Sequence, residues 1–187
     1  MNEDCDSDER LGMLLEYFAE RLNLAYAYFF CAFEFKEDAD AVGDPAANDR
    51  AWSLQTIKNA GLAATLLAVR DLDDFLTPRN SRSKSDDLKA SDFGYSNSLG
   101  FLSESERISI NKLIVHSTTT GAQSQGLRWD VWELTSKCRA QSFEFLRWVE
   151  SHYGFSRFSL VTAAICCRTK TQKIHEFFSA EIERQRK

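Results

Sequence analysis

The stretch SESERISINKLIVHSTTTG, residues 103–121, combines a helix start, a helix end and one of the three histidines of the chain. Ser103 and Glu106 have the spacing of a capping box, in which the serine accepts a backbone N–H and the glutamate reaches back. Mostly apolar residues follow, and Gly121 can adopt the positive φ that often ends a helix. The stretch therefore predicts a helix of about 14 residues that begins at Ser103 and closes near His116.

The rest of the chain also has the features of a helical protein. Apolar residues recur at helical spacing in long segments, and Pro78 and Gly154 stand where two of these segments end. The chain has only 2 Pro and 8 Gly but 14 Phe and 4 Trp, which favours helices around an aromatic-rich core. We expect helices over about residues 7–34, 45–76 (or 49–76), 103–116 and 127–153.

The C-terminal part allows two interpretations. FSRFSLVTAAICCRT, residues 155–169, mixes β-branched residues with helix formers, but a lone strand would have no partner, so a helix from about Ser156 is favoured. TQKIHEFFSAEIERQRK, residues 171–187, is amphipathic. The expected fold is all-α: an antiparallel bundle of four main helices over residues 8–153, with one or two extra helices in residues 154–187 that pack on the bundle or project from it.

Composition and charge exclude several classes of protein. The net charge is −5, so any contact with nucleic acid needs a local basic patch. The acidic start MNEDCDSDER is unlike a secretory signal, and no run approaches the roughly 18 apolar residues of a membrane span. The 5 cysteines are odd in number and lack C-x-x-C spacing, which indicates reduced thiols, with Cys166 and Cys167 as small core residues. We expect a cytoplasmic protein without membrane contact.

Motifs for cofactors and metals are absent from the sequence. It contains no G-x-x-x-x-G-K-[ST], G-x-G-x-x-G or G-x-S-x-G, and no E-x-x-H or H-x-x-x-H. We therefore expect no cofactor and no metal site. The carboxylates of Asp71, Asp73 and Asp74 are expected to face solvent, and His152 and His175 to lie at helix ends or on the surface.

Residues 79–100 form a polar, serine-rich segment without helical periodicity. Between Arg79 and Lys89 it holds four basic residues and two acidic ones, Asp86 and Asp87. A segment of this length is either a solvated loop or a contact patch for phosphates or a partner. The candidate nucleic-acid contacts are Arg79, Arg82, Lys84 and, on the following helix, Arg107.

His116 also has two interpretations on its spacing alone. Lys112 lies four residues before it, on the same helix face, whereas Asn111 is about 140° around an ideal helix. No carboxylate stands at helical spacing to orient the imidazole. The residue either closes the helix, stabilised by the helix dipole, or transfers protons near neutral pH.

The stretch INKLIVHSTTTGA, residues 110–122, resembles the signature helix of the HEPN superfamily, particularly its abortive-infection-like members. Two Phe/Trp-rich helices before it and WDVWEL, residues 129–134, after it extend the resemblance over about residues 8–153. The resemblance implies a helical bundle that pairs with a second copy of itself. It also implies, in active members, a metal-independent ribonuclease in which an Arg precedes the His by four to six residues.

This chain departs from that pattern, because Asn111 stands five residues before His116 where the family pattern has an arginine. A neutral amide cannot hold a phosphate as a guanidinium does, and Lys112 offers only a point charge. One hypothesis is a non-catalytic member of a defence or toxin–antitoxin system that acts through protein or RNA contacts. The alternative is a ribonuclease at a homodimer cleft, with His116, Asn111 and Lys112 as candidate catalytic residues. A third, a small-ligand-binding protein, rests on the aromatic-rich core alone.

Overall fold

A computed structural model describes residues 3–34, 45–79, 83–84, 87–97, 99–112, 130–153 and 158–185. All regular structure in these ranges is helical and none is strand, so the all-α prediction is confirmed. The elements are α1 (Glu3–Leu24), α2 (Ala27–Glu34), α3 (Pro45–Leu76), the 3-10 helix η1 (Ala90–Phe93), α4 (Glu104–Ile110), α6 (Val131–Tyr153) and α7 (Phe158–Gln185).

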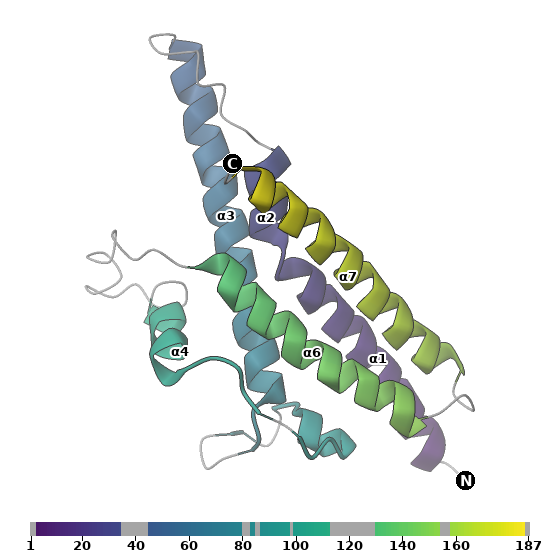
Figure 1. Cartoon of the computed structure of the whole chain (residues 1–187). Helices are drawn as coiled ribbons and strands as arrows, with labels where there is room; N and C mark the ends of the chain where they lie inside the picture. The colour runs from purple at the N-terminus through teal and green to yellow at the C-terminus, as the bar shows by residue number, and fades with distance from the viewer. Residues whose placement is uncertain are drawn as a thin grey trace.

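The four long helices form the bundle (Figure 1). Each contacts two neighbours: α1 packs on α3 and α7, and α6 packs on α3 and α7. Helices α1 and α7 run in one direction, and α3 and α6 run in the other (Figure 1). The neighbours α3 and α6 run the same way, because α6 begins beside the middle of α3 and not at the end where α3 stops (Figure 1). The N-terminal part of α3 extends beyond its neighbours (Figure 1).

The single helix expected over residues 7–34 is wrong, because the chain breaks between α1 and α2 at Ala25 and Tyr26. The hydroxyl of Thr65, on α3, enters this break. It accepts the N–H of Tyr28 at 2.9 Å and donates to the carbonyl of Leu24 at 3.3 Å. A side chain that enters the backbone ladder is a recognised cause of a sharp kink. Thr65 is fully buried, so it supplies partners that water cannot.

Helix α2 lies very close to α3 at Gly61. A Cβ atom at this position would stand 2.8 Å from the Cys31 sulfur and 3.1 Å from the carbonyl oxygen of Ala27. The absence of a side chain therefore lets the two helices approach each other. The small residues of NAGLAATLLAV predict such an approach, and the structure places it at Gly61.

Aromatic rings fill the core in two groups. Toward the end of α3, the rings of Phe18, Phe75 and Phe145 have centroids 5.1 to 5.6 Å apart. At the break between α1 and α2, a second group consists of Phe178, Tyr26, Phe29, Trp132 and His175, in which each ring contacts at least one other. Edge-to-face and stacked pairs of this kind add roughly 0.5–1.5 kcal/mol each beyond the burial of their area.

The described part of the 79–100 segment packs on the bundle. Tyr95 is 4% exposed, and its ring lies 5.4 Å from the rings of Phe145 and Trp148. Ala90, at the start of η1, is fully buried. A few apolar residues at irregular spacing thus attach a polar segment to the core, which explains why periodicity did not reveal them.

The C-terminal part forms one helix, α7, which contacts both α1 and α6. Phe178 is 1% exposed and belongs to the core, so α7 is one of the bundle helices and does not project from the bundle. In the described part of the chain, every helix falls short of the length and apolar character that a membrane crossing requires.

Candidate functional site

Helix α4 begins as its sequence predicts. The Ser103 hydroxyl accepts the N–H of Glu106 at 3.3 Å, and the Glu106 carboxylate accepts the N–H of Ser103 at 2.7 Å. Lys137, on α6, lies 3.3 Å from the same carboxylate. Partial burial raises the pKa of Glu106, but the hydrogen bonds from Ser103 and the ammonium of Lys137 hold it below its ordinary value. The cap therefore also ties α4 to α6.

Arg107 is directed toward α3. Its Nε lies 2.6 Å from a carboxylate oxygen of Asp73, in an ion pair that is not a hydrogen bond, because the Nε–H does not point at that oxygen. Its Nη2 donates to the Thr77 hydroxyl at 3.0 Å. The expectation that Asp73 faces solvent is wrong: it is 2% exposed. Arg107 therefore anchors α4 to the end of α3.

The other oxygen of Asp73 holds the chain that leads into α4. It accepts the N–H of Phe101 at 2.6 Å and that of Leu102 at 2.8 Å. Gly100 lets the backbone pass this close, because a Cβ there would collide with the Arg107 Nη2 and lie 3.0 Å from Asp73 Oδ1. One buried carboxylate thus organises two backbone amides and one guanidinium.

Two of the three candidate catalytic residues, Asn111 and Lys112, follow the C-terminal end of α4. Asn111 follows α4 in helical conformation, and its buried Oδ1 has no hydrogen-bond partner in the part of the chain that the structure describes. Lys112 is exposed. His116, like Gly121, lies outside the described residues, so the predicted end of this helix is not tested.

Arg79, a candidate nucleic-acid contact, instead makes hydrogen bonds within its own segment. Its Nε and Nη2 donate to the two carboxylate oxygens of Asp92 at 2.9 and 2.8 Å. It also donates to the backbone carbonyls of Lys84, at 2.9 Å, and Asp87, at 2.7 Å. The hydrogen bond to Asp92 raises the pKa of Arg79 and lowers that of the carboxyl.

The other candidates of this patch are placed differently. Lys84 is exposed, whereas Arg82 lies outside the described residues. Lys89 is 3% exposed. Its Nζ donates to the backbone carbonyl of Asp74 at 2.7 Å and lies 3.1 Å from the side-chain carboxylate of the same residue. Among the described cations of this segment, Lys84 is therefore the one whose side chain is exposed and has neither a hydrogen bond nor an ion pair with described residues.

The expectation for His175 is wrong, because it lies within α7, away from its ends, and is half-buried. Its ring stacks on Trp132 with 4.5 Å between centroids, and its Nδ1 is 3.1 Å from the Tyr26 hydroxyl oxygen. Burial, reinforced by the charge of Arg139, lowers the pKa of His175 to about 4, and burial raises the pKa of Tyr26. Near neutral pH, both groups are therefore uncharged. His152 is exposed on α6 and stacks on Trp148 at 4.7 Å.

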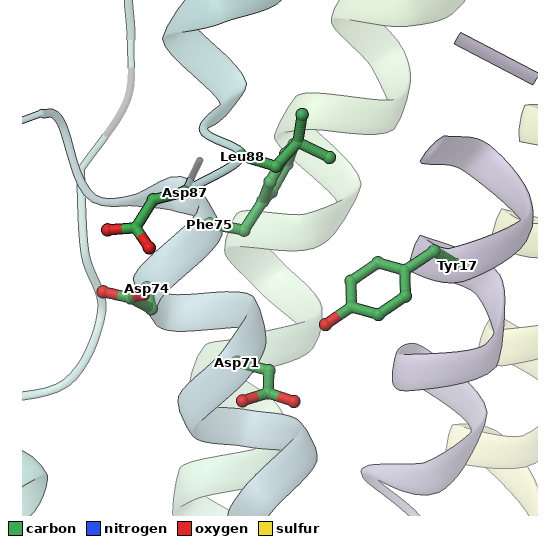
Figure 2. A pocket seen from close by; sticks show the side chains of 6 residues that line it. All are labelled: Tyr17, Asp71, Asp74, Phe75, Asp87 and Leu88. Atoms are coloured by element: carbon green, nitrogen blue, oxygen red, sulfur yellow. The ribbon is translucent and has the colours of Figure 1, made fainter. Parts of the chain in front are cut away.

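An acidic hollow of about 390 Å³ lies between α1, α3 and residues 87–88. Figure 2 shows the Tyr17 ring reaching from α1 across this hollow toward Asp71. Its lining residues are Tyr17, Asp71, Asp74, Phe75, Asp87 and Leu88. Burial raises the pKa of Asp71, against the opposing charges of Arg21 and Arg70.

The carboxylates of this hollow already have partners from the same chain. Arg21 lies 3.6 Å from Asp71, Lys89 pairs with Asp74, and Asp87 accepts the backbone N–H of Lys84 at 2.8 Å. Within the described ranges, no group of three or more His, Cys, Asp or Glu side chains is arranged to hold a metal ion. The hollow is therefore a region where opposite charges of the chain meet.

A second hollow has the opposite charge and lies between α6 and α7. It measures about 480 Å³, and we call it the α6–α7 groove. Sequence reasoning missed it, because the periodicity of α6 and α7 does not show which of their polar residues meet. Its lining residues are Phe143 and Arg147 from α6, with Arg168, Thr169, Gln172, Lys173 and Glu176 from α7.

Cys138 does not add a reactive group to these sites. Cys31 and Cys138 are both free thiols. Cys138 is fully buried, with its sulfur 4.0 Å from the Ser142 hydroxyl, and burial raises the pKa of its thiol to about 12. The thiolate, which is the nucleophilic form, is therefore negligible at neutral pH.

Comparison with known proteins gives no family assignment for this chain. No protein-family model, curated protein or solved structure matches it.

Proposed function

We propose that this chain is a non-catalytic, HEPN-like helical bundle of the cytoplasm, of the defence or toxin–antitoxin kind, which acts by contacting RNA or a protein. The observation that carries the proposal is the position of Arg107. Its guanidinium is paired with buried Asp73 and with Thr77, on the side of α4 that packs on α3. Asn111, at the place of the family's arginine, has no charge to give a phosphate.

The chemistry of RNA cleavage explains why this matters. A ribonuclease without metal needs a group that moves a proton and a cation that binds the phosphate as charge develops. His116 can supply the first. Moving Arg107 to supply the second would leave the carboxylate of Asp73 buried and unpaired, which costs several kcal/mol. Lys112 lacks the planar fork that holds two phosphate oxygens.

Pairing with a second copy of the chain is part of the proposal. Large apolar side chains on the surface offer material for an interface: Phe30 is 43% exposed and Phe177 is 59% exposed. Both rings contact the core residue Phe178, at centroid distances of 5.0 and 5.2 Å. They therefore lie near each other where α2 meets α7.

The test is an RNA cleavage assay in EDTA with the full chain, its His116→Ala variant and its Asn111→Arg variant. We expect the wild type to cleave no faster than His116→Ala. If only the missing cation prevents catalysis, Asn111→Arg cleaves RNA whereas the Asn111→Arg, His116→Ala double variant does not. Cleavage by the wild type that disappears in His116→Ala would establish the alternative, a metal-independent ribonuclease.

A further inference from the structure

We propose that the α6–α7 groove binds the phosphate groups of a nucleotide or of a short RNA strand. The groove lies between the two C-terminal helices and contains neither α4 nor the candidate residues near His116. Its volume of about 480 Å³ falls within the roughly 300–1,000 Å³ of small-molecule sites.

Three cations line the groove and keep donors for a ligand. Arg147 and Arg168 each use one nitrogen, Nη1, in an ion pair, with Glu144 and Glu150 respectively. A guanidinium carries five N–H donors, so each retains nitrogens that can bind phosphate oxygens. Lys173 is exposed and makes no ion pair among the described residues. Oxyanions are the ligands that such a set of donors binds best.

The other side of the groove presents ordered acceptors. Arg139 donates to the amide oxygen of Gln172 at 2.8 Å, and the Gln172 nitrogen donates to the Glu176 carboxylate at 2.6 Å. These two hydrogen bonds fix the orientation of the Gln172 amide. The Arg139 guanidinium lies over the Phe143 ring, 5.2 Å from its centroid. The Glu176 carboxylate retains lone pairs that can accept hydroxyl or amino hydrogens.

The carboxylate of Glu176 distinguishes between two kinds of ligand, because those of Glu144 and Glu150 are already paired with Arg147 and Arg168. A nucleotide has anionic phosphates for the cations and ribose hydroxyls or base amino groups for Glu176. The side chains of an acidic peptide also bring anions for the cations, but they bring only acceptors and no donor for Glu176. The groove therefore fits a nucleotide or RNA better than an acidic protein segment.

This inference rests on the proposed function only in naming the place of the RNA contact. RNA cleavage that depends on His116 would overturn the non-catalytic proposal and leave the groove as a binding site. Failure of the groove variants to change binding would overturn this inference and leave the cleavage result as it stands.

The experiment measures binding of a fluorescently labelled octa-uridylate to the full chain by polarisation at 50–200 mM salt. We expect Lys173→Ala and Arg147→Ala each to weaken binding about tenfold and to lower the salt slope by about 1, because each removes one phosphate contact. Lys170→Ala is the matched control: Lys170 is exposed on the same helix and does not line the groove. We expect it to change the affinity less than about twofold. All three side chains are exposed, so the variants should retain the wild-type melting temperature.

Unlabelled pyrophosphate and poly-glutamate are the competitors. Displacement by pyrophosphate supports a site for phosphates alone, and displacement only by unlabelled RNA supports a site that needs the strand. The proposal is overturned if octa-uridylate does not bind saturably or if poly-glutamate competes as well as RNA. An equal loss of affinity in Lys170→Ala and Lys173→Ala would also overturn it, since the attraction would then be general.

Discussion

Asp73 shows how one residue can determine the role of another. Its carboxylate is buried and holds Arg107 and the backbone amides of Phe101 and Leu102. Burying a charged carboxylate without such partners would cost much free energy of folding. The carboxylate, the guanidinium and the two amides therefore depend on one another. Arg107 is thereby a structural arginine of the bundle.

We predict that Asp73→Asn lowers the free energy of unfolding by about 2–4 kcal/mol. Asparagine retains the shape but not the charge, and loss of one partner of a buried pair typically costs about 3–5 kcal/mol. We expect a somewhat smaller loss here, because the side chain of Arg107 is 36% exposed. Urea denaturation checks this. Glu144→Gln, which breaks an exposed pair with Arg147, is the control and should cost less than about 1 kcal/mol.

His175 makes the stability of the fold depend on pH. The pKa of its imidazole is about 4 in the fold, below its ordinary 6.5, because of burial and then of Arg139. The unfolded chain therefore binds more protons between those pH values, and the fold loses stability as pH falls from 6.5 toward 4. Above pH 6.5 this residue contributes no pH dependence.

The check is urea unfolding at several pH values, with His175→Gln as the comparison. Glutamine can still accept a hydrogen bond from the Tyr26 hydroxyl but does not titrate. The stability of the variant should therefore change less between pH 6.5 and 4 than that of the wild type. An NMR titration midpoint for the His175 ring above 6.5 in the folded protein would contradict the explanation.

At the scale of elements, the break between α1 and α2 depends on Thr65 of α3. We predict that Thr65→Val destabilises the fold by about 1–3 kcal/mol, because the Tyr28 N–H and the Leu24 carbonyl lose a buried partner. Thr135→Val is a matched control: this buried hydroxyl donates only to the carbonyls of Val131 and Trp132 within its own helix. Thermal denaturation should show a larger loss of stability for Thr65→Val than for Thr135→Val. Equal losses of stability would be evidence against a special role for Thr65.

Sequence patterns could predict helices more readily than contacts between them. The capping box of Ser103 and Glu106 is local, and the structure confirms it. The break at Ala25 was missed because its cause is 40 residues away, in Thr65. Burial of Asp73 was missed for the same reason: its partners come from residues 101–107.

For the candidate site, the sequence could predict which residues carry a charge but not which of them are free to bind a ligand. The sequence identifies Arg79 and Arg107 as cations, but the partners that occupy them, Asp92 and Asp73, come from other segments. The α6–α7 groove likewise exists only after two helices pack together. Charge is therefore visible in a sequence, whereas its availability to a ligand depends on tertiary structure.

At the scale of the whole molecule, the four long helices form a stable support, and α4 is attached to it by Arg107 and Lys137. This arrangement places Asn111 and Lys112 at the end of a helix whose only arginine is committed to the core. These features are the reason why we propose binding instead of cleavage.

The measurement that tests this account most directly is the ratio of RNA cleavage rates of the wild type and His116→Ala, in EDTA and with equal protein concentrations. The account predicts a ratio of about 1, because Asn111 stands where the family pattern has an arginine and Arg107 is paired with Asp73. A ratio of about 100 or more, the usual contribution of a general acid or base, would contradict it.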